Sequence, residues 1–306
     1  MTIINKIIDG KMYAEKLLGE IHPLCKGFLN NFNRKPCLTV ILVGDNPASK
    51  IYVKNKILIA KKIDIESKEI LLGSDVTEDE LTHHISILNK DQNVDGILVQ
   101  LPLPKHISEK KIINLISPSK DVDGFHPKNF GKLFMGDPKF IPCTPLGCLY
   151  MLKHEIDDIK GKNAVIIGRS NIVGKPMASL LLSSDCSVTI THSKSKNIEE
   201  HTRKADILIV AVGIPEMIDE KFIKPGAIVI DVGINRLESK NNDNSSNKGV
   251  LVGDVKFENV LKIAKKITPV PGGVGPMTIA CLMHNTVKAA YINKKNDFIN
   301  VLEGIL

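Results

Sequence analysis

The chain has 306 residues, of which 43% are hydrophobic and 25% charged, a composition that suits about two globular domains. It excludes collagen-like and disordered classes. The longest apolar runs, such as 207–212, are far shorter than the roughly 18–20 residues that a membrane span needs. With no secretory pattern at the N-terminus, we expect a cytoplasmic protein without membrane segments.

The net charge of +7 comes from lysines spread along the whole chain, without a dense basic block. Aromatic residues make up only 4%, and Trp is absent, so stacking platforms for nucleic acid are poorly supplied. We therefore expect no nucleic-acid partner, whereas an anionic small ligand stays open. The six cysteines form no CxxC pair and have no His at finger-like spacing, which predicts reduced, mostly buried thiols and no metal site.

The first 120 residues alternate between strand-like and helix-like stretches, the pattern of a parallel sheet built from βαβ units. Asp45-Asn46-Pro47, with a capping side chain before Pro, and the pair Thr77 and Glu80 are typical of helix starts. The expected strands are 37–44, 69–73 and 94–101, and the expected helices are 47–62, one ending near 89, and 107–116.

A Pro-, Gly- and Asp-rich loop over 117–144 is the candidate domain junction, and the alternation then resumes. The polar stretch 239–248 is an expected solvated loop. The expected strands are 163–168, 187–191, 206–212, 227–232 and 250–253, and the expected helices are 145–156, 174–183, 198–204, 257–266 and 277–293. These elements predict an α/β protein of two domains, each with a parallel sheet.

The stretch from Ala164 to Gly174 reads as a strand, a turn with Gly168, and a helix start, which is the setting of a dinucleotide-binding turn. Backbone N–H groups at such a helix start can bind a pyrophosphate. The spacing is Gly-x-Ser-x-x-x-Gly rather than Gly-x-Gly-x-x-Gly. Taken alone, it leaves a purely structural turn as the alternative.

The second strand of a dinucleotide domain selects the ribose, and an acidic residue at its end favours NAD. Here the strand ends in Thr191-His192-Ser193-Lys194, without a carboxylate. Hydroxyls and cations there, with Arg169 in the preceding turn, favour NADP over NAD. A solvated strand end is the alternative interpretation.

A polar constellation is expected in the first domain. Tyr52 and Lys56 share a helix face, and Ser49 lies one turn earlier. Gln100 ends the third expected strand, and Asp123 lies in the loop after the next helix. Because ligands bind at the carboxyl ends of parallel strands, these side chains can converge in one crevice.

At these residues the sequence resembles the bifunctional methylenetetrahydrofolate dehydrogenase/cyclohydrolase family. The resemblance covers about residues 43–278, and the Gly-x-Ser-x-x-x-Gly turn is part of it. The matching stretches are VGDNPASKIYVKNK, DGILVQLPLP, DVDGFHPKNFGKL, PCTPLGC, GRSNIVGKPM, THSKS, KPGAIVIDVGINR, VGDV and TPVPGGVGPMT.

The resemblance implies NADP-linked oxidation of 5,10-methylenetetrahydrofolate to 5,10-methenyltetrahydrofolate, followed by hydrolysis to 10-formyltetrahydrofolate. It implies an N-terminal αβα catalytic domain over 1–144, with 277–306 packing back on it. A Rossmann-like NADP-binding domain would cover 145–276, with a cleft between the two. It also suggests a homodimer through the second domain, for which the edge strand and the helix near 174–183 are candidates.

The resemblance also assigns expected roles. Lys56 would be the principal catalytic group, Tyr52 would stack on the folate and orient Lys56, and Gln100 would tune the proton affinity of Lys56. Asp123 would accept hydrogen bonds from the pterin, and Ser49 would line the substrate site. Cofactor-binding residues would be Gly168, Arg169, Ser170, Ser193 and Ile234, and further substrate-site residues would be Gly273, Gly275, Pro276 and Thr278.

Another two-domain NADP-dependent dehydrogenase, acting on a small hydroxy or keto acid, is the alternative function. It would share the features of 163–194 but would not need Tyr52, Lys56, Gln100 and Asp123 together.

Overall fold

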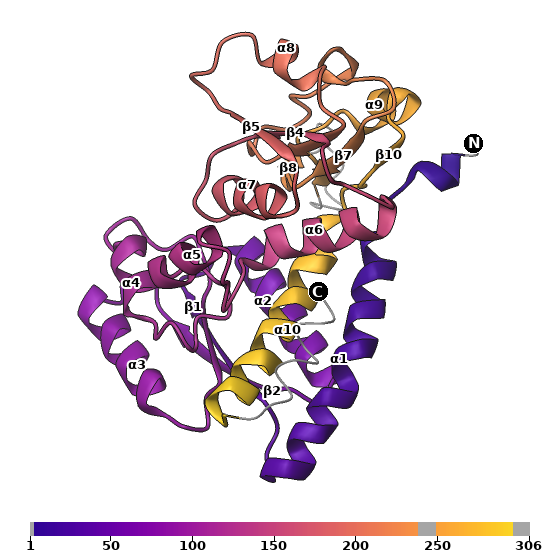
Figure 1. Ribbon diagram of the computed structural model, residues 1–306. Coiled ribbons are helices and arrows are strands. Elements are labelled where there is room, and N and C mark those ends of the chain that lie inside the picture. Colours follow the sequence, from indigo (N-terminus) through magenta and orange to yellow (C-terminus); the bar gives the residue numbers. More distant parts are fainter. Residues whose placement is uncertain (1–2, 238–248, 296–306) are drawn as a thin grey trace. The chain divides into compact units, whose positions relative to one another are not determined.

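A computed structural model describes residues 3–237 and 249–295 of the chain. The chain divides into two compact units (Figure 1). The three-stranded unit comprises residues 14–143 and 279–306, and the five-stranded unit comprises residues 1–13 and 144–278. The N-terminal residues belong to the five-stranded unit because Ile8 N–H donates to the carbonyl of Ile267 at 2.9 Å.

The three-stranded unit is built on a parallel sheet in the order β2-β1-β3. Helices α3 and α4 cover one face of the sheet, and their apolar side chains form a core with β1 and β3. The later turns of α1 and α10 lie side by side, where the Tyr291 hydroxyl donates to the carbonyl of Leu24 at 2.8 Å. The elements are α1 (Gly10–Phe32), β1 (Cys37–Val43), α2 (Pro47–Lys62), β2 (Glu66–Leu72), α3 (Glu78–Lys90), β3 (Gly96–Val99), α4 (Glu109–Leu115), α5 (Pro127–Phe134) and α10 (Val274–Asn293).

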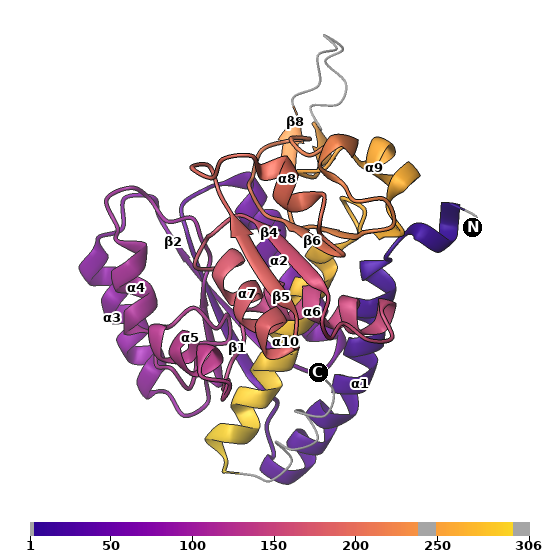
Figure 2. The same ribbon diagram turned by 45° about the horizontal axis from the view of Figure 1, so that its top comes forward.

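The five-stranded unit contains a parallel sheet in the order β10-β7-β6-β4-β5, and Figure 2 shows α7 beside β4 and β5. All five strands are parallel, but the direction in which strands are added to the sheet changes at β4. Strand β5 lies on one side of β4, and β6, the next strand in the chain, lies on the other. Such a reversal creates a ligand-binding crevice at the carboxyl ends of the strands. The elements are η1 (Ile3–Lys6), α6 (Cys143–Glu155), β4 (Asn163–Ile167), α7 (Gly174–Ser183), β5 (Ser187–Thr191), α8 (Ile198–Thr202), β6 (Ile207–Val210), η2 (Glu220–Phe222), β7 (Ile228–Asp231), β8 (Asn235–Leu237), β9 (Val250–Val252), α9 (Phe257–Ile263) and β10 (Lys266–Ile267).

The predicted helix starts are confirmed in the three-stranded unit. The Asn46 side chain accepts a hydrogen bond from Ser49 N–H at 3.1 Å, with Pro47 in the first turn of α2. The Thr77 hydroxyl accepts one from Glu80 N–H at 3.1 Å and thereby caps α3. Strand β1 is buried along its whole length, Thr39 included, as is typical of a mainly apolar strand in a parallel sheet.

Several predicted elements are wrong in type or extent. The predicted loop 117–144 contains α5, whose first turn is capped by His126, where Nδ1 accepts from Lys128 N–H at 3.0 Å. The predicted helix 257–266 ends at Ile263 because Ala264 turns to an extended conformation, and Lys266 pairs with Ile228 instead. Helix α1 and strand β8 were not predicted, and the expected loop 239–248 lies outside the described residues.

Other boundaries shift by a few residues, since fraying ends obey no strict sequence rule. Strand β2 starts three residues before the predicted residue 69, and α10 starts three residues before the predicted residue 277. All six cysteines are free and buried, as predicted. Within residues 3–237 and 249–295, none of the helices has the length and apolar character that a membrane crossing requires.

Candidate active site

Lys56 lies at the centre of the polar group in the three-stranded unit. Helix α2 places it one turn after Tyr52, and its side chain is only 4% exposed. Its Nζ donates to Oε1 of Gln100 at 3.0 Å and lies 4.8 Å from the centroid of the Tyr52 ring. The structure therefore brings Tyr52, Lys56 and Gln100 together, and it buries Ser49 one turn earlier on the same helix.

Burial and the neighbouring groups act on the pKa of Lys56 in opposite directions. Burial lowers the pKa of Lys56, while the negative charge of Asp123 and the Cys143 thiol act to raise it. Burial raises the pKa of Asp123 to about 6, against the opposing effect of Lys56. An amine with a lowered pKa beside a carboxyl with a raised one is suited to moving protons near neutral pH.

The loop that carries Asp123 is held on both sides by buried residues that are not among the predicted site residues. Asp121 accepts hydrogen bonds from the N–H of His126 and from Nδ2 of Asn129, both at 2.8 Å. The Asn285 amide on α10 donates to the carbonyl of Val122 at 2.8 Å. The only sequence signal for them is that Asp121 and Asn129 lie within a stretch of family resemblance, and Asn285 lies outside all those stretches.

The raised pKa of Asp123 predicts an acid limb in the binding of a ligand that donates hydrogen bonds to it. Below about pH 6 the carboxyl is protonated, so each further unit of pH removes about nine-tenths of the ionised acceptor. We expect KM for a substrate that donates hydrogen bonds to Asp123 to rise correspondingly as the pH falls from 7 to 5. Steady-state kinetics across this range measures the effect.

The matched variant for this pH effect is Asp123→Asn, which cannot titrate. Its KM should be high at every pH and should lose the acid limb. An unchanged acid limb in Asp123→Asn would assign the titration to another group.

Gly168 makes the turn after β4 that a side chain would block. Its φ is +124°, and a Cβ there would lie 2.2 Å from the carbonyl oxygen of Ala211. A Cβ at Gly174 would lie 2.2 Å from the carbonyl oxygen of Gly168, so α7 starts against the turn itself. The Ser170 hydroxyl accepts from the N–H of Val173 at 3.1 Å and of Gly174 at 3.3 Å. The close backbone approach at a helix start fits a dinucleotide pyrophosphate.

Three further residues predicted to bind the cofactor lie exposed at carboxyl ends of the same sheet. Arg169 follows β4, Ser193 follows β5, and Ile234 follows β7 with 57% of its surface exposed. The guanidinium of Arg169 and the hydroxyl of Ser193, at the ends of the neighbouring strands β4 and β5, are groups that bind phosphate. The turn and these side chains together fit NADP.

The remaining predicted substrate-site residues lie around the start of α10, whose residues up to Thr278 belong to the five-stranded unit. A Cβ on Gly275 would lie 3.7 Å from Cδ1 of Ile234, an ordinary contact distance, whereas at Gly273 it would lie 2.6 Å from the carbonyl oxygen of Pro269. Pro276 follows in the first turn of the helix, and the Thr278 hydroxyl lies 3.0 Å from that of Thr144. Gly275 and Ile234 are thus neighbours, and Gly273 has no room for a side chain.

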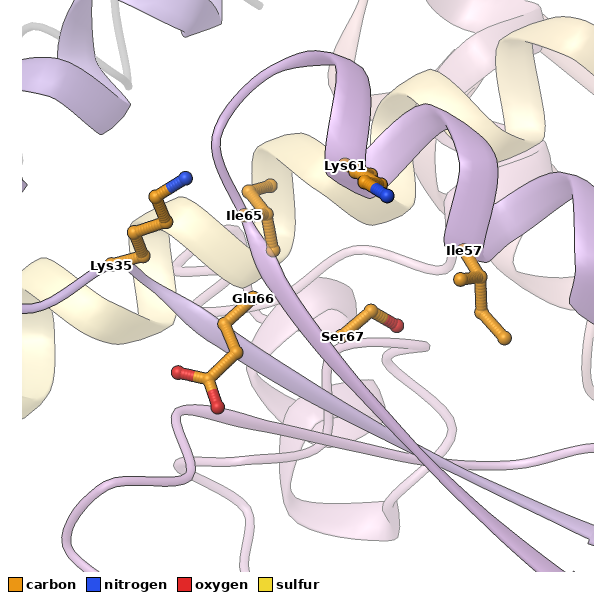
Figure 3. Close-up of a pocket in the computed structure, with 6 residues that line it drawn as sticks. All are labelled: Lys35, Ile57, Lys61, Ile65, Glu66 and Ser67. Atoms are coloured by element: carbon orange, nitrogen blue, oxygen red, sulfur yellow. The ribbon is translucent and has the colours of Figure 1, made fainter.

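A pocket of about 370 Å³ lies apart from these residues, between α2 and the edge strand β2 (Figure 3). None of the predicted site residues lines it. Its Lys35 is already paired with Asp64 at 2.7 Å, so that charge is not available to a ligand without loss of the pair. The lining residues are Lys35, Ile57, Lys61, Ile65, Glu66 and Ser67.

Two family models match most of the chain. The model described as tetrahydrofolate dehydrogenase/cyclohydrolase, catalytic domain, matches residues 8–123. The model of the same family's NAD(P)-binding domain matches residues 142–294. The first contains Lys56 and its neighbours, and the second contains the Gly168 turn.

Curated and solved relatives agree with these matches. Bifunctional protein FolD of Acetivibrio thermocellus is 53% identical over 290 residues, which cover 95% of this chain and 98% of that protein. The crystal structure of the bifunctional FolD enzyme of Campylobacter jejuni is 49% identical, with a TM-score of 0.88, covering 94% of this chain and 98% of that one. The Trypanosoma brucei FolD structure, complexed with NADP and an inhibitor, is 34% identical with a TM-score of 0.89, covering 94% and 98%.

Proposed function

Because the chain belongs to the tetrahydrofolate dehydrogenase/cyclohydrolase family, we propose that the residues around Lys56 form its folate site and those around Gly168 its NADP site. The protein oxidises 5,10-methylenetetrahydrofolate to 5,10-methenyltetrahydrofolate with NADP and hydrolyses the product to 10-formyltetrahydrofolate. The observation that carries the proposed site is the buried amine of Lys56 between the Gln100 amide and the Tyr52 ring.

The dehydrogenase step depends on holding two ligands in place. NADP would supply the hydride acceptor for the one-carbon unit of the folate. The backbone at Gly168 and the side chains of Arg169, Ser170 and Ser193 would hold its phosphates, and Ile234 would contact it. In the folate site, Asp123 would accept hydrogen bonds from the pterin, which fixes the ring before transfer.

The cyclohydrolase step needs a group that moves protons. Water adds to the cationic methenyl carbon and loses a proton, and the ring then opens as its nitrogen gains one. Lys56 would transfer these protons because burial lowers its pKa, so that the neutral amine is accessible. Gln100 would direct the Nζ lone pair and hydrogens, and Tyr52 would stack on the folate while limiting the motion of Lys56.

One assay series tests the proposed function. Purified protein with NADP and 5,10-methylenetetrahydrofolate should give rising absorbance of NADPH, followed by decay of the methenyl absorbance. The same protein with small hydroxy acids should give none. Absence of NADPH with the folate, or turnover of a hydroxy acid instead, would reverse the assignment.

Arg169→Ala should weaken the binding of NADP more than that of NAD, because only NADP carries a 2′-phosphate. We expect about a tenfold or greater loss for NADP, since a charge-assisted contact is worth about 1.5–3 kcal/mol. Isothermal titration with each cofactor measures the two affinities. The matched control is Arg203→Ala, an exposed arginine of the same unit that pairs with Glu199. Equal losses for both cofactors would mean that Arg169 does not read the phosphate.

We also propose that the protein is a cytoplasmic homodimer assembled through the five-stranded unit. Strand β5 is an edge of the sheet, and α7 packs beside it. Exposed apolar side chains at this edge, such as Leu182 and Ile190, support an interface there. Light scattering should give twice the 33.6 kDa of the chain, and a monomer at micromolar concentration would contradict the proposal.

A further inference from the structure

Two buried carboxylates lie beside the proposed NADP site without belonging to it. Asp231 is the last residue of β7, and Asp254 follows β9; their exposed fractions are 3% and 0%. Neither forms an ion pair among the described residues. Buried carboxylates are costly unless hydrogen-bonded, so their partners show what they hold in place.

Asp231 fixes the segment that carries Asp254. One of its oxygens accepts from Gly233 N–H at 2.9 Å and Asp254 N–H at 3.0 Å, and the other accepts from Val255 N–H at 2.9 Å. Gly253 allows this approach, because a Cβ there would lie 1.8 Å from the carboxylate oxygen. The chain after β9 is thereby held against the end of β7.

Asp254 in turn joins two loops. Its Oδ2 accepts from Val212 N–H at 2.7 Å and Gly213 N–H at 2.9 Å, in the loop after β6. Its Oδ1 accepts from Nδ2 of Asn235 at 2.9 Å, at the start of β8 and directly after the turn that follows β7. A Cβ on Gly233 would lie 2.3 Å from the Asp254 carboxyl carbon, so this turn also passes directly over the carboxylate.

These two loops border the crevice assigned to the cofactor. Ile234, the exposed residue of the turn after β7, lies between Gly233 and Asn235. The loop after β6 continues from Ala211, whose carbonyl lies against Gly168. One carboxylate thus connects the loop next to the Gly168 turn with the loop that presents Ile234.

We propose that Asp254 is a positioning residue for NADP binding, which acts through Asn235 and through the N–H groups of Val212 and Gly213. By fixing both loops before the cofactor arrives, it removes the cost of ordering them on binding. The proposal rests on the proposed function, since it takes the carboxyl edge of the five-stranded sheet as the NADP site. Asp254 itself does not touch the cofactor.

The first variant is Asp254→Asn. In the variant, the amide oxygen can accept from both loop N–H groups, and the Asn235 amide can turn over so that its oxygen accepts from the new NH2 group. The hydrogen bonds to an ionised carboxylate are thereby replaced by neutral bonds of about half the strength, so we expect about tenfold weaker NADP binding. Isothermal titration of the full chain with NADP, without folate, measures the affinity independently of turnover.

Exchanging Asp254 and Asn235 separates an effect on loop positioning from a general loss of folding stability. Asn235→Asp alone sets two carboxylates against each other and should also weaken NADP binding. In the double variant Asp254→Asn/Asn235→Asp, the amide at 254 can accept from both loop N–H groups and donate to the carboxylate at 235. We expect the double variant to regain most of the affinity lost in Asn235→Asp, and a double variant no better than Asn235→Asp alone overturns the proposal.

If Asp254→Asn fails to fold, Asn235→Ala keeps the test available, because it removes only the donor to Oδ1. We expect it to weaken NADP binding about threefold, the loss of one ordinary hydrogen bond. Unchanged affinity in Asn235→Ala overturns the proposed role of that contact.

The matched control is Asp206→Asn. Asp206 accepts from Asn163 N–H at 2.9 Å at the amino ends of β4 and β6, the opposite edge of the same sheet. The Asp206→Asn substitution should lower the melting temperature of the protein without changing its affinity for NADP. An equal loss of affinity in Asp206→Asn means that destabilisation alone explains the result and overturns the proposal.

If the unaltered chain binds no NADP, both the proposed function and this inference are refuted. If it binds NADP and the substitutions at 254 and 235 leave the affinity unchanged, only the inference is refuted.

Discussion

Replacing Lys56 with Ala should reduce the hydrolysis of methenyltetrahydrofolate by about 100-fold or more, the range expected when a general acid/base is lost. The reason is the position of its Nζ, which is buried, bonded to Gln100 and close to the Tyr52 ring. The decay of the methenyl absorbance, followed without NADP, measures this step directly.

The structure offers a matched control on the same helix. Lys54 is exposed, so Lys54→Ala removes the same charge from α2 without reaching the buried group. A second variant, Lys56→Met, keeps most of the apolar stem and guards against a loss that reflects poor packing. Hydrolysis near the unaltered rate in both Lys56 variants would refute the proposed role, as would an equal loss in Lys54→Ala.

The sequence predicted the regular parts of the fold because their signals are local. The helix at 174–183 and the strand at 187–191 are confirmed at both ends, and the caps at Asn46 and Thr77 form the expected bonds. Helix α5 was missed because its cap is a histidine ring in a Pro- and Gly-rich stretch. The strand β10 was missed because two residues carry no period, and only the partner strand β7 defines it.

In the candidate site, too, local patterns predicted some residues and tertiary contacts determine the others. The spacing of Tyr52 and Lys56 follows from helix geometry, and Gln100 follows from the end of a strand, so their meeting could be predicted from the sequence. The contacts that hold the surrounding loops in place could not be predicted from the sequence. Asn285 reaches the loop of Asp123 from a helix more than 160 positions later, and the partners of Asp254 come from two different loops. Such contacts depend on tertiary packing, which no local pattern encodes.

The second large effect is expected for Gly168→Ala. A Cβ at this position would lie 2.2 Å from the Ala211 carbonyl oxygen, far inside any contact distance, and the φ of +124° is open almost only to glycine. Either the turn after β4 or the end of β6 must move, at a cost of about 2–4 kcal/mol of stability. Because the same turn would hold the pyrophosphate, we expect at least about 100-fold weaker NADP binding, comparable with other misplacements of about 1 Å.

Gly161→Ala separates the steric effect from the cost of the backbone conformation. Gly161 belongs to the same unit and has a φ of +69°, but a Cβ there would meet no atom within 4 Å. Alanine there should cost about 1–2 kcal/mol for the left-handed conformation and leave NADP affinity unchanged. Thermal unfolding gives the stability of both variants, and titration gives their affinity. If Gly168→Ala binds NADP as well as Gly161→Ala does, the close approach to Ala211 has no part in forming the cofactor site, and the turn after β4 would be a structural connection only.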